Sequence, residues 1–152
     1  MKTVESLQIE LCGYAIDIAK GFGFSLDYSN HSIKHVETIL GYIHEDYMKD
    51  KNEEGLNGVA LEFAFYIGTV IQRVYNVGCF EKDHEEFGEN SYPYYINGGS
   101  IFPHAWCYKR IFDGPQDNVW SKYSILVIDK LEPKSKKKSG FAKMLKKFFK
   151  VE

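Results

Sequence analysis

The sequence predicts an α+β domain that is mostly helical, with a central buried helix, a small β-hairpin and a basic C-terminal tail. In three long segments, apolar residues recur at steps of three and four, the period of an amphipathic helix. A short aromatic segment precedes Asn97-Gly98-Gly99, which is typical of a hairpin turn. Residues 134–152 contain eight Lys and one Glu, unlike the rest of the chain.

The first two helices are expected over about residues 3–21 and 30–47. Glycine commonly ends helices, and Gly21 follows the first apolar stripe directly. Asp27 and Ser29 offer side-chain oxygens that can accept hydrogen bonds at the start of the second helix.

The third helix, about residues 56–77, is apolar on most of its faces. A helix of this kind is buried on most sides, so we place it at the centre of the fold. Gly68 in its interior costs about 1 kcal/mol relative to Ala. We expect a neighbouring backbone to approach closely at this glycine.

In the second half of the chain, some segments fit more than one type of secondary structure. Residues 92–96 and about 100–102 are expected to pair as a hairpin. Residues 104–112 fit a strand by composition or a helix that begins at Pro103, and we favour the helix. Residues 117–130 also fit either element, and their three- and four-residue apolar steps favour a helix.

The charge divides the chain into a globular domain, residues 1–133, and a tail, residues 134–152. The domain has eleven Lys or Arg against twenty Asp or Glu, a formal net charge of −9, and the tail has +7. An acidic domain attracts basic protein partners and repels nucleic acid. The expected partner is therefore a basic protein, with no nucleic acid bound through the acidic body.

Several features favour a cytoplasmic protein. No apolar run approaches the roughly 20 residues that span a bilayer. Glu5, Glu10 and Asp17 interrupt any signal-peptide core. The three cysteines are widely spaced and odd in number, which favours buried thiols over disulfides or a zinc site.

No motif for an enzyme, a cofactor or a metal ion is present. The sequence has no glycine-rich phosphate loop, no serine-nucleophile motif and no calcium loop. His31 and His35 share a helix face but have no third ligand nearby in the sequence, so an exposed pair is the simpler interpretation. We therefore expect a non-enzymatic protein with no cofactor and no metal.

A narrow polar stripe follows the third helix, formed by Glu62, Tyr66, Thr69 and Arg73. Arg73 could bind an anionic group, and a buried Glu62 could act as a general base. The alternative is that this edge of the helix is simply in contact with water.

Two further groups of residues are candidates for binding a partner. Acidic residues concentrate in one expected loop, at Glu81, Asp83, Glu85, Glu86 and Glu89. They could steer a basic partner, whereas the simpler alternative is a solvated loop. Aromatic and arginine side chains, which are common interface anchors, follow closely and include Tyr94, Trp106, Tyr108 and Arg110. These could instead fill space between the hairpin and the helices.

The tail is basic and amphipathic. Over residues 141–151, Phe141, Leu145, Phe148 and Phe149 lie on one side of a helix, and lysines surround the other. Such a segment can bind anionic membranes. Docking on the acidic body and disorder are alternatives.

The segment Tyr66-Ile67-Gly68-Thr69-Val70-Ile71-Gln72-Arg73 resembles a helix of small uncharacterised bacterial domains in which Tyr-x-Gly is followed by Arg. Ile101-Phe102-Pro103 and Tyr108-Lys109-Arg110-Ile111 resemble the same pattern. These domains are similar to bacterial immunity and toxin-neighbourhood families. The resemblance covers about residues 27–130 and implies an α+β fold and a bacterial source, without assigned catalytic residues.

Three functional hypotheses follow. The first is a non-enzymatic protein-binding domain, in its finer form a bacterial immunity-type protein that binds a basic partner. The second is a peripheral adaptor that uses the tail on anionic membranes. The third is a small-ligand or enzymatic pocket beside Glu62, Tyr66 and Arg73.

Overall fold

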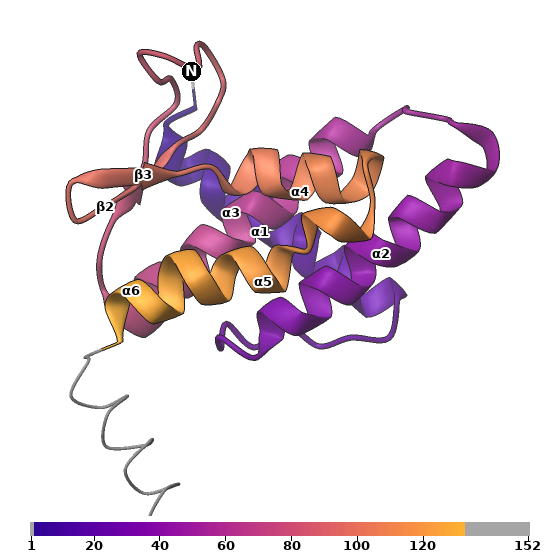
Figure 1. The fold of residues 1–152 in the computed structure, drawn as a ribbon, viewed down its shortest axis with the longest axis horizontal. Coiled ribbons are helices and arrows are strands. Elements are labelled where there is room, and N and C mark those ends of the chain that lie inside the picture. Colours follow the sequence, from indigo (N-terminus) through magenta and orange to yellow (C-terminus); the bar gives the residue numbers. More distant parts are fainter. Residues whose placement is uncertain (1, 133–152) are drawn as a thin grey trace, which may run out of the picture.

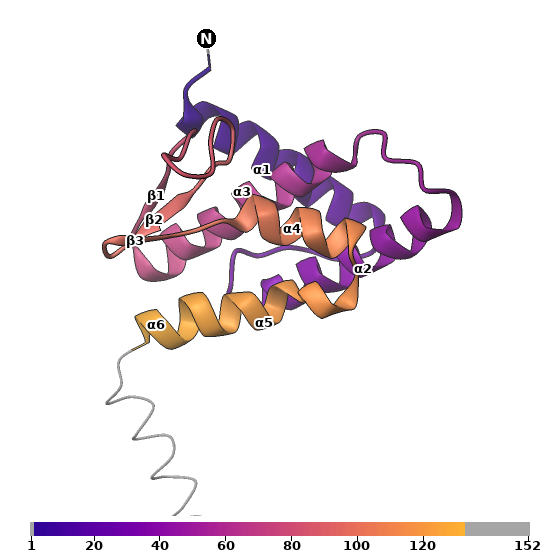
Figure 2. The ribbon, with the colours of Figure 1, turned by 45° about the horizontal axis from the view of Figure 1, so that its top comes forward.

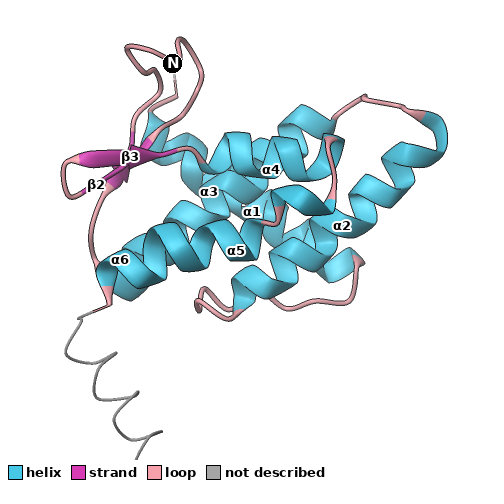
Figure 3. Cartoon of the chain, viewed as in Figure 1, coloured by secondary structure: helices cyan, strands magenta, loops and turns pink. Residues whose placement is uncertain are grey.

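Helix α3 (Leu56–Tyr75) runs through the middle of the molecule, and the other elements surround it (Figure 1). The computed structural model describes residues 2–132. Helices α1 (Val4–Gly21) and α4 (Pro103–Phe112) pack on α3, and α2 (Ser32–Asp50) packs on α4. The fold is α+β and built mainly from helices, as the sequence predicts (Figure 3).

The remaining elements are short and lie in the second half of the chain. They are β1 (Cys79–Phe80), β2 (Tyr94–Ile96), β3 (Gly99–Ile101), the 3-10 turn η1 (Pro115–Asp117), α5 (Val119–Tyr123), the π-helical turn η2 (Ser124–Ile128) and α6 (Asp129–Leu131). α5, η2 and α6 follow one another directly and form one helical rod (Figure 2). The basic tail, residues 134–152, lies outside the described residues.

The predicted central position of α3 is confirmed. Nine of its twenty residues are buried, among them Phe63, Phe65 and Tyr66, which are fully enclosed. Its apolar character on most faces follows from having α1 on one side and α4 on another.

The close approach expected at Gly68 is present, but a side chain makes it. A Cβ placed on Gly68 would lie 2.1 Å from Cε2 of Phe80, at the end of β1. The prediction of a neighbouring backbone was therefore wrong. Glycine lets the Phe80 ring lie close against α3, where the ring also packs edge-to-face on Phe65 at 4.8 Å.

The predicted hairpin is confirmed, and a third strand joins it. β2 and β3 pair in an antiparallel register that places Tyr94 opposite Ile101, and β1 adds to the other edge of β2. Asn97 and Gly98 both have positive φ angles, 46° and 84°, as a two-residue hairpin turn requires. β1 contains only two residues, too few for a sequence period to reveal.

Both ambiguous segments of the second half are helical. Pro103 occupies the first turn of α4, where its missing N–H costs nothing. Asn118 caps α5 by accepting a hydrogen bond from the Ser121 N–H at 2.8 Å. Val127 is the buried residue of the following turn, while Leu126, which the helical step placed inside, is 37% exposed. The π-helical turn adds a residue per turn and shifts the inward face accordingly.

The turn before α2 is tied to the core by tyrosine hydroxyls. The Tyr66 hydroxyl accepts the Tyr28 N–H at 2.9 Å and lies 2.7 Å from Ser32 Oγ. Asn30 donates to the Tyr75 hydroxyl and accepts from the Tyr123 hydroxyl. This turn therefore connects α2 with both α3 and α5.

The start of α2 differs slightly from expectation. Ser29 Oγ accepts the Ser32 N–H at 3.2 Å, so the predicted serine does serve the helix start. Asp27 instead accepts the backbone N–H of Ser29 at 3.1 Å and acts one step earlier.

We predict that Gly68→Ala lowers the free energy of unfolding by roughly 1–3 kcal/mol, because the new methyl group displaces the Phe80 ring. Gly13→Ala is the matched control, since α1 leaves open space around Gly13 and alanine favours a helix by up to about 1 kcal/mol. Urea unfolding of both variants measures the difference. Equal stabilisation by the two changes would contradict the packing at Gly68.

Candidate functional site

Of the polar residues predicted along α3, Thr69 and Arg73 line one groove, whereas Glu62 and Tyr66 do not. Tyr66 is fully buried, and its hydroxyl is already bonded to the turn before α2. Burial raises the pKa of Tyr66 to about 12, so its hydroxyl is protonated at neutral pH. Arg73 is exposed near the C-terminal end of α3. Its guanidinium carbon lies 3.6 Å from the centroid of the Tyr28 ring.

Glu62 lies apart from the arginine. Burial raises the pKa of its carboxyl group, and Oε2 has no hydrogen-bond partner among the described residues. A raised pKa suits a general base only where a substrate can reach it. The groove beside Arg73 has a volume of about 270 Å³ and is lined by Gln8, Thr69 and Gln72 among others, but not by Glu62.

The cysteines near this groove and in the core are poor nucleophiles. Burial raises the pKa of the Cys12 thiol, which lies 3.8 Å from the Tyr28 hydroxyl. Cys107 is fully buried, and burial raises its pKa too. Both thiols remain protonated at neutral pH, whereas nucleophilic chemistry needs a thiolate.

Most of the predicted aromatic anchors lie in the interior. Tyr94 is fully buried, and its hydroxyl donates to the Val77 carbonyl at 2.6 Å. Trp106 is only 7% exposed. Tyr108 is 42% exposed and is the member of this set that the surface presents. The interpretation in which these rings fill space between hairpin and helices therefore applies to Tyr94 and Trp106.

Arg110 is also internal, and its role is structural. Its Nε donates to Glu37 Oε2 at 2.8 Å, and the Glu37 Oε1 accepts the Val119 N–H at 2.9 Å. One carboxylate thus joins α2, α4 and α5. Both charged side chains are largely buried, with 8% and 14% exposed. A buried pair that lacks one member leaves an uncompensated charge in the interior.

The predicted acidic loop between β1 and β2 is at the surface and well structured. His84 and Gly88 exchange two backbone hydrogen bonds of 2.8 and 3.0 Å, and His84 Nδ1 accepts the Glu86 N–H. Asp83 accepts the Asn90 N–H at 2.9 Å. All five acidic residues of the loop are exposed: Glu81, Asp83, Glu85, Glu86 and Glu89.

An exposed aromatic ring lies within this loop. Phe87 is 64% exposed, and one edge of its ring packs on Phe102 at 4.8 Å and on His84 at 5.1 Å. Phe87 was not predicted as a contact residue, because most of its neighbours in the sequence are charged. It supplies an apolar contact at the tip of an acidic surface.

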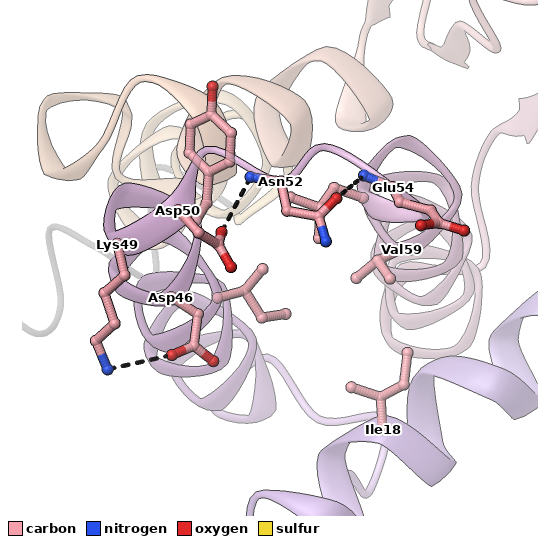
Figure 4. Close-up of a pocket in the computed structure, with 10 residues that line it drawn as sticks. Ile18, Asp46, Lys49, Asp50, Asn52, Glu54 and Val59 are labelled. Atoms are coloured by element: carbon pink, nitrogen blue, oxygen red, sulfur yellow. Dashed lines mark hydrogen bonds and ion pairs between the residues drawn. The ribbon is translucent and has the colours of Figure 1, made fainter.

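A second acidic surface is concave. A groove of about 460 Å³ lies between the ends of α1 and α2 and the start of α3 (Figure 4). Its apolar floor is formed by Ile18, Ile43, Leu56 and Val59. Its other lining residues are polar or aromatic: Asp46, Tyr47, Lys49, Asp50, Asn52 and Glu54. We call this the acidic groove.

Hydrogen bonds from backbone N–H groups to side-chain oxygens fix the rim of the acidic groove. Asp50 accepts the Asn52 N–H, and Asn52 accepts the Glu54 N–H, each at 3.0 Å (Figure 4). Asp46 pairs with Lys49 at 3.5 Å on the exposed face of α2. Three carboxylates therefore surround an apolar floor, with one lysine to offset them.

The acidic groove was not predicted from the sequence, because its lining residues come from three separate helices. The one available signal was the charge of residues 45–54, which contain five acidic residues and two lysines. That segment was interpreted only as the end of a helix and a loop. Which apolar residues lie beneath it depends on tertiary packing.

The remaining candidate features are less developed. The rings of His31 and His35 meet edge-to-face at 5.4 Å. Between residues 2 and 132, no three His, Cys, Asp or Glu side chains gather closely enough to hold a metal ion. None of the helices in this part of the chain has both the length and the apolar character needed to cross a bilayer.

Comparison with protein-family models, with curated proteins and with solved structures finds no match to this chain. The resemblance of the Tyr66–Arg73 segment to immunity-type domains therefore stays a prediction.

We predict that Arg110→Met lowers the free energy of unfolding by roughly 3–5 kcal/mol, because it strands the Glu37 carboxylate in the interior. Lys49→Met is the control, since the Asp46–Lys49 pair is exposed and is worth about 0.5 kcal/mol or less. Chemical denaturation compares the two variants. Equal stability of the Arg110→Met and Lys49→Met proteins would contradict the structural role of the Glu37–Arg110 pair.

Proposed function

We propose that this chain is a non-enzymatic protein-binding domain that recognises a basic, amphipathic segment of another protein. The observation that carries the proposal is the acidic groove, which combines an apolar floor with carboxylates at its rim. Apolar side chains of a partner would fill the floor. Lysines or arginines beside them would meet Asp46, Asp50 and Glu54.

Electrostatics supports a basic partner over an acidic one. Residues 1–133 carry a formal net charge of −9, and the carboxylates of the acidic loop add to the field around the domain. Such a field accelerates encounter with a basic protein and opposes nucleic acid. The acidic loop therefore helps to steer the partner at long range and lies outside the proposed contact surface.

In its finer form, the proposal is a bacterial immunity-type protein that binds a basic partner. Its support is the resemblance of the Tyr66–Arg73 segment and the acidic surface. The dispersal of Glu62, Tyr66 and Arg73 gives the ligand-pocket hypothesis less support than the acidic groove gives to protein binding.

A fluorescent 14-residue peptide of Lys and Leu in an amphipathic helical pattern serves as the probe, with anisotropy as the readout. We predict that the full chain binds it and that the combined change Asp46→Asn, Asp50→Asn and Glu54→Gln weakens binding by about tenfold or more. These changes keep the side-chain oxygens that hold the rim. Binding should also weaken as salt is raised.

Two comparisons make this test decisive. The matched control is Glu81→Gln with Glu85→Gln and Glu86→Gln, which neutralises the same number of charges on the acidic loop and should change the affinity by less than threefold. A peptide with Ser in place of Leu tests the apolar floor. Equal affinity of the groove variant and the unchanged chain, or equal binding of the Ser peptide, would contradict the proposed site.

A further inference from the structure

A second groove lies where the described chain ends. It runs between the β2–β3 hairpin and α6 and has a volume of about 340 Å³. Its apolar residues are Ile96, Ile101, Leu126 and Leu131. Figures 1 and 2 both show the hairpin and α6 at the same end of the molecule. We call this the hairpin groove.

An apolar strip continues from the hairpin groove along the outside of the same helical rod. Ile125 is 59% exposed and Leu126 is 37% exposed, although both sit in the middle of a helical segment. Leu126 lines the hairpin groove and also a shallower one formed with α5 and η1. Two adjacent aliphatic side chains in water, flanked by two grooves, form a surface that another helix can cover.

We propose that the chain's own C-terminal segment, residues 141–151, docks as a helix along the hairpin groove. The point at which the chain leaves the described domain supports this docking. Leu131 lines the groove and is the last residue of α6, so the chain leaves the described domain at the groove's edge. The docking segment is covalently held next to the site, which raises its effective concentration there.

The lengths of the connection and of the C-terminal segment also support this docking. Residues 133–140 form a connection of eight residues, long enough at about 3.3 Å each to reverse direction and bring the segment back. Eleven residues of helix measure about 16 Å, and the rod from Val119 to Leu131 measures about 20 Å. The segment therefore fits along the rod in an antiparallel arrangement.

The pattern of apolar side chains in the C-terminal segment supports the same docking. Phe141, Leu145 and Phe148 recur at steps of four and three, which puts them on one face of a helix. That face matches the apolar strip of Ile125 and Leu126. The lysines on the other faces remain in water, held near a domain of opposite net charge.

The acidic groove is a poorer site for this segment within one molecule. Leu131 lies beside β2, and Tyr94 of β2 donates to the Val77 carbonyl just beyond the C-terminal end of α3. Leu56, at the other end of α3, lines the acidic groove. A helix of 20 residues spans about 30 Å. The nine Cα–Cα steps from Glu132 to Phe141 reach about 31 Å only when fully extended, so docking in the acidic groove would leave the connection no slack. Docking in the hairpin groove leaves the acidic groove open to an outside partner.

Disulfide trapping in the full chain tests the proposal. Ser100→Cys places a thiol on the rim of the hairpin groove, and Met144→Cys places one beside the apolar face of the segment. Both are introduced together with Cys79→Ser, since Cys79 is exposed while Cys12 and Cys107 are buried. We expect rapid oxidation to a monomer with an internal disulfide.

A second pair discriminates between sites. Met48→Cys lies beside the acidic groove on α2, and it is combined with the same Met144→Cys change. Faster trapping of this pair would move the segment to the acidic groove and overturn the proposal. A covalent dimer from the Ser100→Cys pair would overturn it in favour of a second copy, and failure of both pairs to oxidise would overturn it as well.

Hydrogen exchange gives an independent readout that needs no new cysteine. Leu145→Asp should raise the exchange of amides in β3 and α6 by about tenfold, because the segment leaves the groove. Ser139→Asp introduces the same charge in the connection and should leave the exchange unchanged. Indistinguishable exchange in the two variants would overturn the proposal even if one of the disulfides forms.

Discussion

The hydroxyl group of Tyr66 is the constraint on which the arrangement of the helices depends. It lies at the middle of α3 and bonds to the Tyr28 N–H, in the turn that leads into α2, and to Ser32 Oγ, on the first residue of α2. Tyr28 has a φ of 64°, unusual for a residue with a side chain, and the bond to Tyr66 helps to hold that conformation. Tyr66 and Ser32 are both buried, and a buried polar group without a partner costs about 1–3 kcal/mol, so this contact has few alternatives.

The position of α3 separates the two grooves that we propose as docking surfaces. The acidic groove borders its first residues, and the sheet packs near its other end, where the Phe80 ring covers Gly68. The Glu37–Arg110 pair holds α2 and α4 together beside it. The buried central helix therefore has the acidic groove toward one end and the hairpin groove toward the other, and we propose a different occupant for each.

The sequence predicted the helices well because their signal is local. Periodic apolar residues placed α1, α2 and α3 to within a few residues, and Asn97-Gly98 placed the hairpin. The sites were less predictable. Tyr94 and Arg110 have the composition of interface residues, yet each is buried because the chain supplies a distant partner, Val77 or Glu37. The acidic groove was missed because its walls meet only after three helices pack.

The most direct test of this account is the effect of Tyr66→Phe on the free energy of unfolding, measured in urea alongside Tyr42→Phe. Tyr42 is 47% exposed on α2 and serves as the control for loss of a hydroxyl group. The account predicts a loss of roughly 1–3 kcal/mol for Tyr66→Phe and little change for Tyr42→Phe. Equal stability of the two variants would contradict a central role for the Tyr66 hydroxyl.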